Sequence, residues 1–145
     1  CVKFRKNRNT KAKKYHFKDL LKTQIYDTNQ GTVYVYLKVK GKNNYIVLEE
    51  VILGEVSLYQ RLAYGQHASF GVWSDYSIEY YYVKKANEIA VSYLGSTEFS
   101  SKKFKKTASN YFKDCPELVS KIQNKDYRKR NIRTIIEFYN THCKK

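Results

Sequence analysis

Two cysteines frame a helical pattern near the C-terminus, and they are the residues whose chemistry most needs an explanation. Cys115 stands in DCPEL, where the pattern begins, and Cys143 stands in FYNTHC, where it ends. Two helices joined by a short turn usually lie antiparallel, so the start of the first lies near the end of the second. The pattern favours a disulfide between Cys115 and Cys143. Buried free thiols, a metal site and a catalytic thiol are the alternatives.

Metal binding and catalysis fit the sequence less well than a disulfide. Zinc sites usually contain close pairs of cysteine and histidine ligands, but His16 and His67 are isolated, and adjacent side chains such as His142 and Cys143 do not face each other on a helix. No glycine-rich phosphate loop or Ser/His/Asp pattern occurs. We therefore assign no catalytic residue, no metal site and no cofactor, and an enzyme is the least favoured hypothesis.

Basic residues form the second group that could do chemistry. The chain carries 28 Lys and Arg against 13 Asp and Glu, a formal net charge of +15. Such a field favours anionic partners, namely nucleic acid, acidic glycan or anionic lipid head groups. The alternative is a solvated helix face that binds nothing. The candidate anion patch consists of Lys102, Lys103, Lys105, Lys106, Arg128, Lys129, Arg130 and Arg133.

A third candidate is the segment GQHASFGVWSD, residues 65–75, which we interpret as a loop because it holds two glycines and follows a strand pattern. Loops often carry function, and exposed aromatic side chains act as anchors for partners. His67, Phe70 and Trp73 are the candidate ligand contacts. The alternative is a hydrophobic plug over an open end of the sheet.

The elements that position these residues follow from the hydrophobic periodicity. Residues 32–40 alternate strictly between apolar and polar, as a half-buried strand does. Further strand patterns cover residues 45–53, 56–64, 76–85 and 88–94, joined by short turns, which indicates an antiparallel meander. After Gly95 the period changes to that of helices. The sequence predicts an α+β fold with about five or six antiparallel strands followed by three helices.

The second helix has the clearest start signal. Asp114 or Cys115 can cap it, Pro116 suits its first turn, and Asn124 is a plausible stop. A third helix is expected from about Tyr127. We divide a single domain, residues 1–145, into a basic arm or edge strand (1–18), an antiparallel sheet (19–95) and a helical segment (96–145).

Several features bear on where the protein works. A disulfide requires an oxidising compartment, and the sequence contains no methionine, which a removed signal peptide, a chosen boundary or proteolysis would each explain. We expect export to the periplasm or outer envelope, with a lipoprotein as an option if Cys1 is the mature N-terminus. No stretch is apolar enough for a membrane span.

Residues 112–143, FKDCPELVSKIQNKDYRKRNIRTIIEFYNTHC, resemble the C-terminal segment of a family of uncharacterised exported proteins from Bacteroidetes. GEVSLYQ (54–60) and YYYVKKANEIAVSY (80–93) are similar to the middle of that family. The resemblance implies a signal peptide and export but no activity and no catalytic residues. Two hypotheses follow: a non-catalytic interaction or structural module of the cell envelope, with a protein partner open, or a polyanion-binding protein that uses the basic arm and helices.

Overall fold

Strands come first in the chain and helices follow, which confirms the predicted α+β class. The computed structural model describes residues 2–4, 9, 11, 13–15, 25–27 and 31–143. Its strands are β1 (Val2–Phe4), β2 (Lys13–Tyr15), β3 (Ile25–Asp27), β4 (Thr32–Lys38), β5 (Tyr45–Ile52), β6 (Val56–Ser69), β7 (Val72–Lys85) and β8 (Ser92–Ser96). Its helices are α1 (Ser101–Tyr111), α2 (Pro116–Gln123), the short 3₁₀ helix η2 (Lys129–Asn131) and α3 (Ile132–His142).

The main sheet is a meander, as predicted. Strands β3 to β8 pair in chain order, and every pair is antiparallel. β1 and β2 pair with each other in a separate two-stranded sheet. The described part of the predicted basic arm therefore does not form an edge strand of the main sheet. Most of residues 1–18 lie outside the described part of the chain.

The main sheet curls until its two ends meet. Val39, just after β4, forms a parallel bridge with Val91, just before β8. The Lys40 N–H donates to the Val91 carbonyl at 2.8 Å, and the Val91 N–H donates to the Lys38 carbonyl at 2.9 Å. Val39, Leu48, Tyr59 and Val91 are buried together inside this curl, which forms the smaller of two cores.

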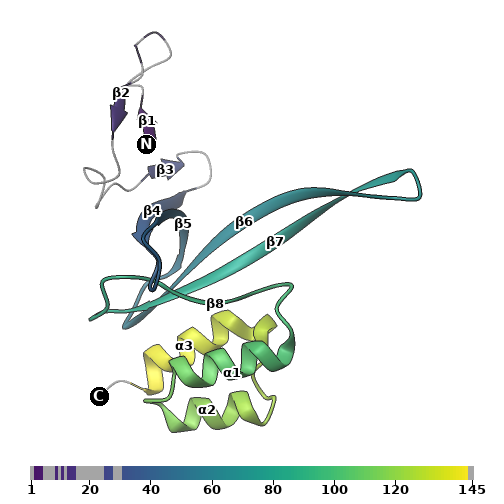
Figure 1. Cartoon of the computed structure of the whole chain (residues 1–145). Helices are drawn as coiled ribbons and strands as arrows, with labels where there is room; N and C mark the ends of the chain where they lie inside the picture. The colour runs from purple at the N-terminus through teal and green to yellow at the C-terminus, as the bar shows by residue number, and fades with distance from the viewer. Residues whose placement is uncertain are drawn as a thin grey trace.

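The larger core lies between the sheet and the helices (Figure 1). Side chains alternate across a strand, so Val56 and Leu58 of β6 face the helices while Tyr59 faces the inside of the curl. α1 packs against β8, α3 packs against β6, and α2 packs against the other two helices. The helical residues of this core are Phe104, Ala108, Phe112, Cys115, Leu118, Ile122, Ile132, Ile135, Ile136 and Tyr139.

The bounds of the second helix match the prediction, but those of the third do not. Cys115 is the N-cap of α2, Pro116 is its first residue, and Asn124 is its C-cap. α3 begins at Ile132 rather than near Tyr127, because η2 precedes it. Residues 124–128 are needed to reverse the chain direction, and this reversal shapes the site described below.

The interpretation of residues 65–75 as a loop is wrong. β6 and β7 stay paired without a break from Val56↔Lys85 to Ser69↔Val72, so only Phe70 and Gly71 form the turn. Both have positive φ, 50° and 78°, as a two-residue turn matched to strand twist requires. In Figure 1 this hairpin projects far beyond the rest of the molecule. The two glycines misled the prediction, since Gly65 lies within β6.

Candidate anion-binding site

Cys115 and Cys143 form a disulfide, as the sequence favoured, with their Cα atoms 5.6 Å apart. It joins the N-cap of α2 to the C-cap of α3. Free thiols, a metal site and a catalytic thiol are thereby set aside for these two sulfur atoms. Among the described residues, no group of three or more His, Cys, Asp and Glu side chains is placed to hold a metal ion.

Two carboxylates, Asp114 next to Cys115 and Glu88 after β7, fix the helices to the β7–β8 connection. Asp114 pairs with Lys85 at 2.8 Å and accepts a hydrogen bond from the Tyr139 hydroxyl at 2.5 Å. Glu88 accepts a hydrogen bond from the Tyr111 hydroxyl at 2.6 Å and one from the Lys85 N–H at 2.9 Å. Every partner of these carboxylates serves packing between elements, so we assign them a structural role.

These contacts shift the pKa values of the groups involved. Burial alone would raise the pKa of Asp114, but the hydrogen bonds from Lys85 and Tyr139 outweigh it and lower that pKa. Burial likewise opposes the lowered pKa of Glu88, which the hydrogen bonds from Tyr111, Lys85 and Lys40 produce. Burial and the neighbouring carboxylate raise the pKa values of Tyr111 and Tyr139. The charged carboxylate and the neutral tyrosine are therefore the forms that the fold stabilises.

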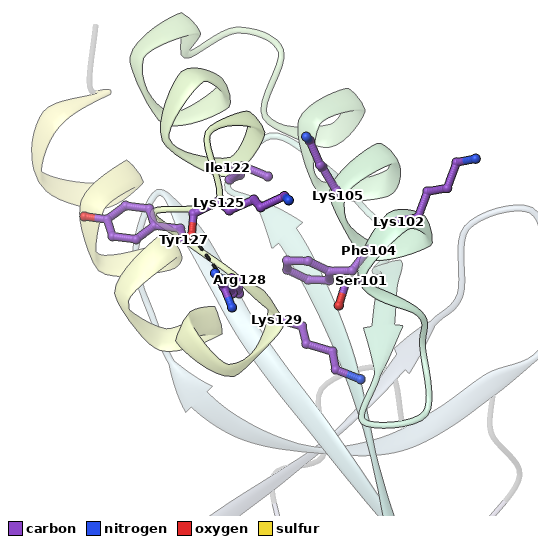
Figure 2. A pocket seen from close by; sticks show the side chains of 9 residues that line it. All are labelled: Ser101, Lys102, Phe104, Lys105, Ile122, Lys125, Tyr127, Arg128 and Lys129. Carbon is purple, nitrogen blue, oxygen red and sulfur yellow. Dashed lines mark hydrogen bonds between the residues drawn. The ribbon is translucent and has the colours of Figure 1, made fainter.

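The feature that best fits a binding site is a cleft of about 420 Å³ between α1 and the chain reversal after α2 (Figure 2). This volume lies within the range of small-molecule sites, roughly 300–1,000 Å³. Five of the nine lining residues are cationic. The residues that line the cleft are Ser101, Lys102, Phe104, Lys105, Ile122, Lys125, Tyr127, Arg128 and Lys129.

The floor of the cleft is apolar and its rim is basic. Phe104 and Ile122 belong to the larger core and are 2% exposed, so they present a fixed surface. Figure 2 shows the Phe104 ring at the centre of the cleft, with lysines of α1 on one side and Lys125 and Arg128 across from them. Such a site suits a ligand with an anionic group attached to an apolar or ring-shaped body.

Helix periodicity places the cations of α1 on this rim. Lys102 and Lys105 are three residues apart, which puts them on the same side of the helix. Phe104 lies between them in sequence and points into the core. Lys106 does not line the cleft, and Lys103 Nζ lies 6.0 Å from the centroid of the Phe99 ring.

Lys125 reaches the rim through an unusual backbone conformation. Its φ is +67°, in the left-handed region that often ends a helix and that glycine normally occupies. The N–H groups of Lys125 and Asp126 bond to carbonyls of α2, those of Ile122 at 3.3 Å and Lys121 at 3.0 Å. A lysine at this position costs about 1 kcal/mol relative to glycine. Its ammonium group lies at the cleft, which is a reason for the protein to bear that cost.

The remaining two cations are held by backbone carbonyls. Arg128 Nε donates to the Lys125 carbonyl at 3.3 Å. Lys129 Nζ donates to the carbonyls of Thr97 and of Phe99, the latter at 2.8 Å, and so ties η2 to the segment before α1. Lys129 thus positions the wall of the cleft, while Arg128 keeps the rest of its guanidinium available to a ligand.

No acidic side chain of the described residues lines the cleft. In the described part of the chain the ion pairs are Lys40–Glu88 and Lys85–Asp114, and neither lies there. Five like charges with no carboxylate among them raise the local positive potential. A bound anion would reduce the repulsion between these cationic side chains.

The predicted anion patch is therefore brought together only in part. Lys102, Lys105, Arg128 and Lys129 meet at the cleft. Arg130 and Arg133 instead line a separate recess of about 270 Å³, which also contains Glu79 and Tyr81. Sequence reasoning missed the apolar floor and Lys125. The turn signal after Asn124 was visible, but it did not indicate which side chains the reversal would bring opposite α1.

The candidate ligand residues His67, Phe70 and Trp73 lie at the outer end of the β6–β7 hairpin rather than on a loop. All three are exposed, Phe70 fully and Trp73 to 70%. They do not line the cleft described above. Their exposure shows that they do not plug an end of the sheet.

Comparison of the chain with protein-family models, curated proteins and solved structures finds no match. The resemblance of residues 112–143 to a Bacteroidetes family stays a prediction. None of the helices in the described ranges is both long and apolar enough to cross a bilayer.

Proposed function

We propose that this protein is a non-catalytic interaction module that binds an anionic partner through the cleft between α1 and the α2–η2 reversal. The observation that carries the proposal is the set of cationic side chains around an apolar floor, with no carboxylate among the described residues that line the cleft. The proposal combines the two functions expected from the sequence, an interaction module and a polyanion binder. The proposed contact surface is on the helices.

The chemistry of the cleft selects a phosphate or sulfate group. Arginine presents a planar fork that pairs with two oxygens, and lysines add point charges around it. The apolar floor favours a sugar ring or another ring system next to the anionic group over a bare inorganic ion. An acidic glycan, a nucleic acid end and a phosphorylated lipid head group share this chemistry.

The disulfide supports a location outside the cytoplasm. A bridge between Cys115 and Cys143 persists in oxidising compartments and is rare where thiols are kept reduced. We propose export, with the periplasm or outer envelope as the compartment. An acidic glycan or a lipid head group would be available to the cleft there.

Chromatography on heparin tests the proposed function. Retention should persist at physiological salt, about 0.15 M, where the screening length is near 8 Å. The logarithm of the binding constant should fall linearly with the logarithm of the salt concentration. Elution of the folded protein well below that salt would overturn the proposal.

A further inference from the structure

The outer part of the β6–β7 hairpin, residues 61–78, pairs with no further strand among the described residues and does not line the cleft. We call it the projecting hairpin. Residues 62–74, LAYGQHASFGVWS, contain no Lys, Arg, Asp or Glu, although 28% of the chain is charged. Large apolar side chains are exposed along it. They are Leu62, Tyr64, Phe70, Val72, Trp73 and Tyr76.

Within the part of the chain that the structure describes, both edges of the projecting hairpin are open. β5 pairs with β6 only as far as Gln60, and β8 pairs with β7 only as far as Tyr80. Residues 61–69 of β6 therefore present unpaired backbone groups along one edge. Natural proteins usually protect such edges with charges, proline or a covering segment, and residues 62–69 have no charge and no proline.

The projecting hairpin is nevertheless rigidly built. A two-residue turn closes it, and the strands stay in register along their whole length. The Tyr76 ring lies across Gly65 on the neighbouring strand, where a Cβ atom would overlap it, so the aromatic ring fills the space that the glycine leaves. A preformed hairpin loses little conformational entropy when it docks.

We propose that the β6 edge of the projecting hairpin pairs antiparallel with the same edge of a second copy, centred near Gly65. The two hairpins then form a four-stranded sheet across a two-fold axis. Such a contact is self-complementary, as symmetric dimers require. Leu62 of one copy would lie beside Ala68 of the other, on the same face as Trp73.

The positions of the charged residues favour pairing through the β6 edge over pairing through the β7 edge. Arg61 is the one charged residue in the open run of β6, and antiparallel pairing about Gly65 puts the two copies of Arg61 at opposite ends. On β7, symmetric pairing would bring Asp75 close to its own copy, which is unfavourable for like charges. The Glu79 carbonyl already accepts from the Thr97 N–H at 3.0 Å, so the β7 edge is partly occupied.

Charge also favours a second copy over other partners. An acidic protein would be attracted to the basic body of the molecule rather than to an uncharged hairpin. Two copies with a net charge of +15 each repel one another. Antiparallel hairpins keep the two bodies at opposite ends of the shared sheet, beyond the screening length of about 8 Å at physiological salt.

A lipid bilayer fits the projecting hairpin less well. Bilayer hydrocarbon cannot satisfy unpaired strand edges, and the apolar side chains continue from the tip down to Leu62 rather than gathering at the tip.

Sedimentation of the full chain tests the proposal. We expect a dimer at micromolar concentrations, weakened at least about tenfold by Tyr64→Lys, since an edge lysine opposes strand addition. Ile89→Lys is the matched control, because Ile89 is 93% exposed on the body of the molecule and Tyr64 is 80% exposed on the projecting hairpin. The control should leave the dimer unchanged.

A nitroxide label supplies a second measurement that does not depend on a disruptive variant. A label at Gln66 should show strong dipolar broadening from its partner, and a label at Lys113 on the body should show none. A chain that stays monomeric at about 100 μM overturns the proposal, as does a dimer unaffected by Tyr64→Lys. A monomer that binds vesicles through Trp73 also overturns it, in favour of a lipid surface.

Discussion

Asn140 of α3 hydrogen-bonds both backbone groups of Val56, 84 residues earlier in the chain. The Val56 N–H donates to Asn140 Oδ1 at 2.7 Å, and Asn140 Nδ2 donates to the Val56 carbonyl at 2.9 Å. Val56 is fully buried and begins β6, so these bonds fasten the last helix to the sheet. The Asn140 side chain therefore satisfies the same backbone N–H and carbonyl groups that a neighbouring strand would satisfy.

Replacement of Asn140 by alanine should lower the free energy of unfolding by about 2–3 kcal/mol. Two partly buried backbone groups would lose their partners, and each costs about 1 kcal/mol or more. Chemical denaturation measures the change. Asn140→Asp should have an effect of similar size, because a carboxylate keeps the bond from the Val56 N–H but repels the Val56 carbonyl.

Gly54 makes room for this contact. A Cβ atom at Gly54 would lie 2.5 Å from Asn140 Nδ2. Gly54→Ala should therefore destabilise the protein in the wild-type background and cost clearly less in the Asn140→Ala background. A double-mutant cycle gives this coupling. Equal costs in the two backgrounds would show that the close approach does not matter.

Removal of the disulfide should cost about 3–4 kcal/mol in the chain-entropy model, because it closes a loop with a sequence separation of 28. Cys115→Ser with Cys143→Ser is the variant, and denaturation under non-reducing conditions is the measurement. Alkylation of unreduced, denatured protein should modify neither sulfur. Labelled thiols at both positions would contradict the disulfide and the export inferred from it.

Acid should destabilise the protein through Asp114 and Glu88. Their folded-state pKa values are lowered, so the stability they contribute is present above their unfolded values, about 4, and is lost as pH falls through the folded values. Free energies of unfolding measured between about pH 6 and 2 should decline, and the double variant Asp114→Asn and Glu88→Gln should decline less steeply. An unchanged slope would contradict the assignment.

Lys125→Gly should change stability and binding in opposite directions. Glycine adopts the left-handed conformation without the cost that lysine bears there, so the free energy of unfolding should rise by about 1 kcal/mol. Affinity for a sulfated disaccharide should fall several-fold, because one cation leaves the rim. A variant that is more stable and binds as tightly as the wild type would show that Lys125 serves only to end α2.

The sequence predicted the elements with a strong period and missed the geometry between them. The alternation in residues 32–40 and the DCPE signal before α2 act locally, so β4 and α2 were placed within about two residues. The β6–β7 hairpin was interrupted in the prediction because Gly65 and Gly71 look alike in sequence. Only Gly71 is in the turn, while Gly65 faces the Tyr76 ring across the strands.

The candidate site was predicted only in part, again because local patterns are visible in the sequence and tertiary packing is not. Lys102 and Lys105 share a helix face by periodicity alone, so a basic cluster on α1 was visible. Whether Arg128 or Arg130 lies opposite depends on the chain reversal after Asn124, which is set by tertiary packing. That Phe104 and Tyr127 line the same cleft depends on the same packing.

The most direct test of the account is a calorimetric titration of a sulfated disaccharide into two double variants of equal charge. Lys102→Ala with Lys105→Ala removes two cations from the cleft, and Lys106→Ala with Lys113→Ala removes two exposed cations that do not line it. The first variant should bind at least about tenfold more weakly, since a charge-assisted contact contributes more than 1.4 kcal/mol. The second should bind nearly as tightly as the wild type. Equal losses in both variants would contradict a defined site and leave only diffuse charge.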